Sequence, residues 1–161
     1  MKNQTRRLKH SAMSYLSRFC VLLMCLSLFS AIHADAQVRS IGQVRTVKDA
    51  RIARSGLELA ALVGAPLEEK DTLITGHSGS IGFVLNDNSV ISLGPDSRMT
   101  LSEFKFEPQE GNVSLIGDIV SGTMEYISGK ISKISKDAAK FRTPYTTVAA
   151  RGTRLLVRVK E

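Results

Sequence analysis

The chain of 161 residues is 43% hydrophobic, has no tryptophan and carries 22 Lys and Arg against 15 Asp and Glu. Its formal charge of +7 would suggest a nucleic-acid partner, but residues 1–36 hold five of the basic and one of the acidic residues, so the remainder carries only +3 and we expect no such partner. Both cysteines, Cys20 and Cys25, also lie in that first segment, so residues 37–161 have neither a disulfide framework nor thiolate chemistry.

Residues 1–36 have the three parts of a secretory signal peptide. An uncharged, mostly apolar run at residues 19–32 precedes Ala34-Asp35-Ala36, an Ala-x-Ala cleavage site. The basic residues before the cleavage site are Lys2, Arg6, Arg7, Lys9 and Arg18. We expect cleavage before Gln37 and a protein in the periplasm or outside the cell. The alternative is a retained anchor, but a 14-residue helix covers only about 21 Å of a ~30 Å hydrocarbon core, so we expect no membrane span after cleavage.

Residues 37–161 are predicted to form a single, nearly all-β domain. Their number suits one domain, which at this length buries about two-thirds of its unfolded surface. Apolar and polar residues alternate with period two between turns rich in Gly, Asn, Asp and Pro. We expect short strands in a rolled or solenoid-like stack, with a β-sandwich as the alternative.

The expected strands are separated by short turns. In chain order they are residues 41–47, 51–54, 73–75, 80–85, 90–93, 98–106, 113–116, 119–127 and 141–143, with a last strand after Gly152. Gly76 closes the third of these strands, and Asn86-Asp87-Asn88 predicts a hairpin turn. Gly122 predicts a bulge.

Four lysines follow the long strand that ends at residue 127: Lys130, Lys133, Lys136 and Lys140. At spacings of three and four they would share one face of a helix, or they would flank a short strand at residues 131–134. As a functional feature, they would dock on an anionic envelope polymer or a lipid headgroup. As a structural feature, which we favour, they form a solvated face or guard a sheet edge against pairing.

Catalytic and metal chemistry have few candidate residues after the signal segment. His77 is the one histidine there, and it lies among turn residues, where we expect an exposed side chain. Carboxylate pairs could act on glycans, but all of them lie beside turn signals, as surface acids do. These pairs are Glu68-Glu69 with Asp71, Asp87 with Asp96, and Glu107 with Glu110. We expect no catalytic residue, no metal and no cofactor.

The order of short motifs along the chain resembles the FecR domain of bacterial envelope signalling proteins. The motifs are "GAPLEEKDTLITGHSGSIGFVLNDNSVISLGPDSRMTL", then "GTMEYISG", then "FRTPYTTVAARGTRLLVRV". The resemblance covers residues 41–159, and the residues that carry it are Gly64, Asp71, Thr75, Gly76, Ser89, Gly94, Pro95, Ser97, Thr143, Pro144, Arg151, Gly152 and Thr153. It implies an all-β periplasmic domain that acts in signal reception and protein contact. The best-known members relay a signal from an outer-membrane metal-chelate transporter to an extracytoplasmic-function sigma factor.

The terminal Arg151-Gly152-Thr153 tripeptide has two interpretations. Gly152 would permit a positive φ or a bulge, and Arg151 would pair with an earlier carboxylate, Asp71 being the expected one, to close the fold. Alternatively, Arg151 and Arg154 face a partner. Beyond the glycine, Thr153, Leu155, Val157 and Val159 are expected on one face, Arg154, Arg158 and Lys160 on the other, and Leu156 is an exception.

The sequence therefore predicts an exported, non-enzymatic domain that binds another envelope component, a protein or a polymer, in signal relay. The residues expected to contact that partner are Arg151, Arg154, Lys130, Lys133 and Lys136. A small glycan-acting enzyme and a structural or adhesive envelope protein are the alternatives.

Overall fold

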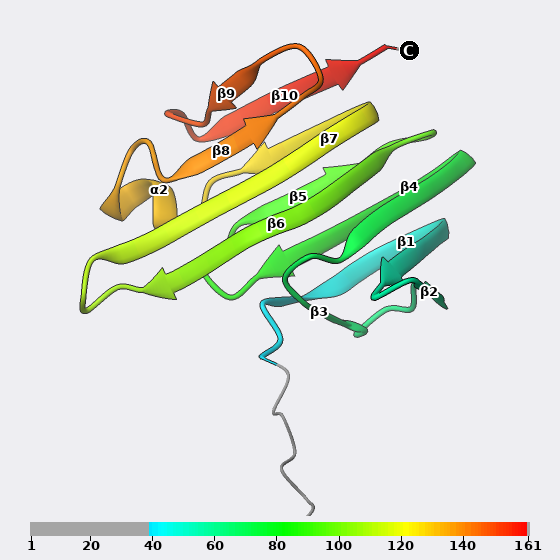
Figure 1. Ribbon diagram of the computed structural model, residues 1–161, viewed down its shortest axis with the longest axis horizontal. Coiled ribbons are helices and arrows are strands. Elements are labelled where there is room, and N and C mark those ends of the chain that lie inside the picture. The colour runs from blue at the N-terminus through cyan, green and yellow to red at the C-terminus, as the bar shows by residue number, and fades with distance from the viewer. Residues whose placement is uncertain (1–38, 161) are drawn as a thin grey trace, which may run out of the picture. The chain divides into compact units, whose positions relative to one another are not determined.

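The computed structural model describes residues 39–160, so the predicted signal peptide and its cleavage site lie outside the described residues. Ten strands form one sheet, and one short helix follows the longest strand (Figure 1). The strands are β1 (Gly42–Arg54), β2 (Leu57–Ala60), β3 (Pro66–Leu67), β4 (Thr72–Leu85), β5 (Val90–Leu93), β6 (Arg98–Glu107), β7 (Asn112–Ile127), β8 (Ala139–Arg142), β9 (Thr147–Ala149) and β10 (Arg154–Val159), and the helix is α2 (Ile131–Ile134).

The centre of the sheet is formed by the two long strands β4 and β7, whose corresponding halves run in the same direction because each pairs antiparallel with β5 and with β6. β5 pairs with the second half of each long strand, and β6 pairs with the first half. The four strands therefore form a closed circuit of pairings. The connections within this group are short: the β4–β5 turn spans residues 86–89, and residues 94–97 link β5 to β6.

The outer strands extend the sheet on both sides of this centre. β1 pairs with β4 along nearly its whole length, and its other edge carries β2 and β3. Beyond β7, β10 pairs antiparallel with its second half and β8 pairs parallel with its first half, while β9 pairs with β8. Figure 1 shows β8, β9 and β10 at the upper edge of the view and β1, β2 and β3 at the lower edge.

Irregularities occur near the middle of each long strand. β1 has register shifts on both sides of the segment 46–48, and β7 has one at Val120, which no β6 residue opposes. The sheet bends at this level, since the two halves share a single hydrophobic core. Leu73, Leu115 and Phe141 come from one half, and Phe83, Ile91 and Tyr126 come from the other. Aliphatic residues dominate this core, as the scarcity of aromatic residues requires.

The all-β prediction is confirmed, and several predicted strands agree closely with the structure. β5 has the predicted bounds, and β6 extends one residue beyond them. Three expected breaks are wrong: β1 continues through residues 48–50, β4 through Gly76, and β7 through Gly117-Asp118. In β7 the reason is pairing on both sides, because Gly117 lies between Leu101 of β6 and Phe141 of β8.

The last strand has the predicted alternation of faces. Leu155 and Val157 are half-buried and Val159 is buried, whereas Arg154, Leu156 and Arg158 are exposed. Thr153 was expected on the buried face, but it is exposed and lies before the start of β10. The lysine-rich segment forms the short helix α2, so the helical alternative holds for Ile131–Ile134.

Candidate binding surface

Thr75 and Ser97, two residues of the sequence motif, are buried and join β4 and β7 to the link between β5 and β6. The Thr75 hydroxyl donates to the carbonyl of Gly94 at 2.7 Å and accepts from the amide of Ser97 at 2.8 Å. The Ser97 hydroxyl in turn accepts from the amide of Thr123 in β7 at 2.9 Å. Backbone groups that regular pairing leaves free at the bend are thus satisfied by side chains. Thr75 and Ser97 therefore stabilise the fold through buried hydrogen bonds.

A bulge was predicted at Gly122, and the register shift in β7 lies two residues earlier, at Val120. The φ of Gly122 is +88°, and a Cβ at this position would lie 2.4 Å from the Cα of Ser97. No other residue fits both the backbone conformation and the space. Gly122 thus lets β7 pass close to the link between β5 and β6.

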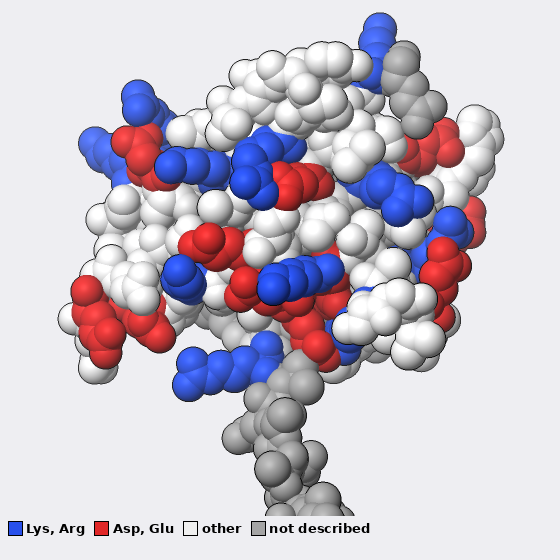
Figure 2. Space-filling model, in the orientation of Figure 1, with Lys and Arg blue, Asp and Glu red and all other residues white. Residues whose placement is uncertain are grey.

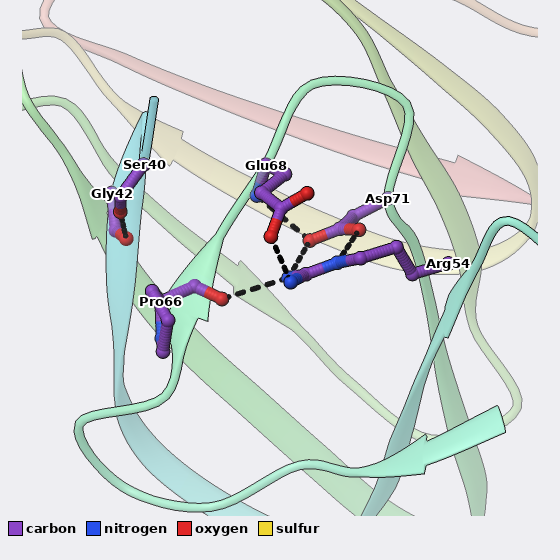
Figure 3. Close-up of polar contacts among 6 residues, drawn as sticks. All are labelled: Ser40, Gly42, Arg54, Pro66, Glu68 and Asp71. Carbon is purple, nitrogen blue, oxygen red and sulfur yellow. Dashed lines mark hydrogen bonds and ion pairs between the residues drawn. The ribbon is translucent and has the colours of Figure 1, made fainter. Parts of the chain in front are cut away.

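Asp71, another motif residue, is fully buried and binds Arg54 at the end of β1 (Figure 3). The Arg54 Nε and Nη2 atoms donate to the two carboxylate oxygens of Asp71 at 2.7 Å each, and Nη2 also donates to the carbonyl of Pro66 at 2.9 Å. Glu68 is a second carboxylate partner of the same guanidinium. The hydrogen bond to Asp71 raises the pKa of Arg54 above its ordinary value, against the opposing effect of burial. This cluster fastens β1 to the link between β3 and β4.

The expected pairing of Arg151 with Asp71 is wrong. Arg151 donates from Nε to Asp137 at 2.7 Å, and the side chains are 72% and 58% exposed. Asp71 already has a bidentate partner in Arg54, which arrives from the adjacent strand β1. Gly152 has no positive φ, and a Cβ there would meet no atom closer than 4.0 Å. The tripeptide is therefore an exposed link between β9 and β10 rather than a buried clasp.

Sequence reasoning did not single out Arg54, although it makes the most extensive ionic contacts of the described residues. It precedes the turn at Ser55-Gly56 and ends an otherwise ordinary strand. Nothing local separates it from the exposed arginines, because its partners lie 14 and 17 residues further along the chain. Asp71 itself follows Glu68-Glu69-Lys70 in the sequence, so nothing local marks it as a buried carboxylate that needs a cation.

A second buried carboxylate, Asp87, holds α2 against the β4–β5 turn. Its Oδ2 accepts from the Ser89 hydroxyl at 2.7 Å and from the amide of Ile131 at 3.2 Å. The network continues from Ser89 to the Tyr126 hydroxyl at 3.3 Å and from there to the Ser132 hydroxyl at 2.9 Å. Asp87 thereby caps the first turn of α2 from a distant part of the chain. This arrangement fixes where the neighbouring lysines lie.

The residues expected to contact a partner meet at one end of the domain. The amide of Lys130 donates to Asp87 at 2.8 Å, the amide of Ser128 donates to Thr153 at 3.0 Å, and the Arg151–Asp137 pair joins the α2–β8 link to the β9–β10 link. We call this surface the basic end, and it consists of Lys130, Lys133, Lys136, Lys140, Arg151 and Arg154. All six residues are exposed. In Figure 2 Lys and Arg side chains gather at the upper left of the view, where Figure 1 shows α2.

The basic end is only partly neutralised by its own acidic residues. Arg151 pairs with Asp137 and Arg154 pairs with Glu125, whereas its four lysines make no ion pair within residues 39–160. Two apolar side chains accompany the cations, Ile127 at 41% exposure and Ile134 at 45%. Exposed cations beside exposed aliphatic side chains suit a partner that is anionic and partly apolar.

The candidate catalytic residues are dispersed or already engaged. His77 lies within β4 rather than in a turn, and its exposed ring contacts Asp96 at 3.0 Å. Glu68 and Asp71 share Arg54, and Glu107 accepts from Asn112 at 2.6 Å. Over residues 39–160 no group of three or more His, Cys, Asp or Glu side chains could hold a metal ion, and no helix is long and apolar enough to cross a membrane.

Comparison with known proteins gives one match. A family model described as "FecR protein" matches residues 71–161, which is more than half of the chain. The matched range begins at Asp71 and includes Thr75, Ser97 and Gly122. Arg54, the partner of Asp71, lies before the matched range. No curated protein and no solved structure matches the chain.

Proposed function

Because this chain belongs to the FecR protein family, whose members are signalling and regulatory domains, we propose that it is an exported, non-enzymatic module that recognises another component of the cell envelope. In this proposal the contact is one step of a signal relay. The family relation supports a regulatory role, and the predicted signal peptide supports a location in the periplasm or outside the cell.

The observation that carries the proposal is the convergence of cations at the basic end. Lys130 and Arg154 are far apart in sequence, yet the hydrogen bond from Ser128 to Thr153 brings their segments together. The hydrogen bond from the amide of Ile131 to Asp87 holds the start of α2, and with it the neighbouring lysines, beside this surface. A partner that recognises the basic end would carry carboxylate or phosphate groups, since these are the groups that Lys and Arg bind.

The strength of such a contact would depend on ionic strength. Exposed charges attract each other over a Debye length of about 8 Å at physiological salt and about 3 Å at 1 M salt. Lysine side chains are flexible point charges and would give association speed and selectivity for anionic partners more than affinity. The exposed Ile127 and Ile134 would supply a contact that salt does not weaken.

The test is capture from envelope extract with a tagged protein spanning residues 37–161, followed by identification and purification of the captured component. A variant with Lys130, Lys133 and Lys136 changed to Glu should lose at least tenfold in affinity for that component. The matched control changes three exposed cations elsewhere, Arg39, Arg45 and Lys48, to Glu and should bind like the natural protein. Equal loss in both variants would show a nonspecific charge effect, and unchanged binding in the first would refute the proposed surface.

A further inference from the structure

The last strand, β10, leaves one edge of the sheet open. It pairs with β7 over six successive residues with no register shift, and no strand within residues 39–160 pairs with its other edge. Every second residue of an antiparallel edge strand directs its N–H and C=O groups away from its partner. At six residues β10 is longer than the other strands that pair with a single partner, which are β2 with four residues, β9 with three and β3 with two.

This edge has arginines at two positions of its exposed face, but it lacks the other features that protect an open edge. Natural edges are commonly guarded by proline, by a bulge or by charges along the strand. β10 contains neither proline nor bulge, and the centre of its exposed face is Leu156, which is 69% exposed. Leu156 lines a groove of about 500 Å³ together with Met124, Val157 and Arg158. A large aliphatic side chain lies between two arginines, of which Arg154 pairs with Glu125 and Arg158 makes no ion pair within the described residues.

Charge complementarity identifies the kind of strand that fits. In an antiparallel dimer of two β10 strands centred on Leu156, Arg154 of each copy would lie opposite Arg158 of the other. Like charges placed directly opposite each other destabilise strand pairing. A second copy of this chain is therefore disfavoured on this edge. Acidic side chains opposite the two arginines and an aliphatic one opposite Leu156 would instead make favourable cross-strand pairs.

We propose that the open edge of β10 receives an extended segment of another protein with the pattern acidic–x–aliphatic–x–acidic, which adds to the sheet as a further strand. Main-chain hydrogen bonds supply affinity in this mode of recognition, and alternate side chains supply specificity. The pattern is symmetric about its aliphatic residue, so it fits in either strand direction. This site is separate from the α2 part of the basic end and shares only Arg154 with it.

The test is binding of the synthetic peptide Thr-Glu-Val-Leu-Val-Glu-Thr, with blocked termini, to a protein spanning residues 37–161, measured by calorimetry and by NMR shifts of the β10 amides. Two N-methylated versions, modified at alternate residues, separate strand addition from side-chain contact. One version loses the amides that face β10 and should bind at least tenfold more weakly, and the other should bind like the unmodified peptide. No binding at millimolar peptide, or equal binding by all three peptides, would overturn the proposal.

Protein variants test the side-chain pattern and separate this site from the basic end. Arg158→Glu should lower the affinity for the acidic peptide at least fivefold. It should raise the affinity for a peptide in which both Glu are replaced by Lys. Arg158 is exposed and makes no ion pair within the described residues, so the fold should tolerate the change, and a melting curve checks this. The control Arg45→Glu and the triple Lys130, Lys133 and Lys136 variant should keep the affinity within about twofold. Equal loss in Arg158→Glu and Arg45→Glu would contradict recognition by β10.

Discussion

The rings of Tyr126 and Phe141 pack together with centroids 4.9 Å apart and planes tilted by 56°. Phe141 of β8 lies opposite Gly117 of β7, nine residues before Tyr126 on the same strand. Nine residues of a straight strand span about 30 Å. The contact therefore requires β7 to bend back on itself, and this bend brings the two halves of the sheet around one core.

At Gly122 the bent strand β7 passes close to the backbone of Ser97, so replacement of this glycine should destabilise the domain. Gly122→Ala introduces strain at φ +88° and a Cβ 2.4 Å from a backbone atom of Ser97. Positive φ alone costs a non-glycine residue about 1 kcal/mol, and the clash adds to that cost. The control is Gly111→Ala, which has φ +68° but open space around the added Cβ. Urea denaturation should show a clearly larger loss for Gly122→Ala, and equal losses would mean that the bend tolerates a side chain.

Arg54→Ala should be among the most damaging surface-accessible substitutions. It leaves the carboxylate of Asp71 buried without a cation, which typically costs about 3–5 kcal/mol of folding stability. Arg151→Ala removes an exposed ion pair and should cost less than about 1 kcal/mol. Thermal melting of the two variants compares these values directly. A comparable loss for Arg151→Ala would restore the interpretation of the terminal tripeptide as a clasp.

The pair of Asp118 and Arg142 should make part of the stability sensitive to acid. Hydrogen bonding from Arg142, aided by Ser102, lowers the pKa of Asp118 below its ordinary value despite partial burial. Protons therefore bind more readily to the unfolded chain, whose Asp pKa is about 3.9. The contribution of this ion pair to folding stability is fully present above the unfolded pKa and is lost as pH falls through the lower pKa of the folded protein. Asp118→Asn should flatten the melting temperature curve below about pH 4, and an unchanged acid dependence would contradict the assignment.

Asp87 should control the position of α2. Asp87→Ala removes the acceptor of the Ile131 amide and of the Ser89 hydroxyl, and buried groups left unsatisfied cost about 1–3 kcal/mol each. Hydrogen exchange should speed up at the amides of Lys133, Ile134 and Ser135, which bond within α2. Asp96→Ala, at an exposed carboxylate, is the control. Unchanged exchange in Asp87→Ala would show that α2 is held by packing alone.

The signal segment gives a prediction that needs no structural measurement. Expression of the full chain in a bacterium with a secretory pathway should yield a protein whose N-terminal residue is Gln37, because Ala34 and Ala36 are the small residues that signal cleavage requires. Intact-mass spectrometry of the purified protein measures this. A mass that includes residues 1–36 would favour the retained anchor instead.

The sequence alone was sufficient for features that depend on local order. Alternation of apolar and polar residues placed β5 at Val90–Leu93 and predicted the exposed and half-buried faces of β10 at Leu155, Leu156 and Val157. The turn residues around Asp87 predicted the β4–β5 hairpin, and the order of motifs identified the family, which the match to residues 71–161 confirms. Each of these signals lies within a few residues or in the order of short motifs.

Only the tertiary structure determined which distant groups meet. Arg54 rather than Arg151 binds Asp71, because β1 lies beside β4 whereas the terminal link lies beyond β8. β7 continues through Gly117 because β6 and β8 pair with it on both sides. Side-chain alternation encodes which face of a strand is buried, but the pairing of strands far apart in the chain depends on where the sheet bends. That bend is a collective result of packing, so no single stretch of sequence reveals it.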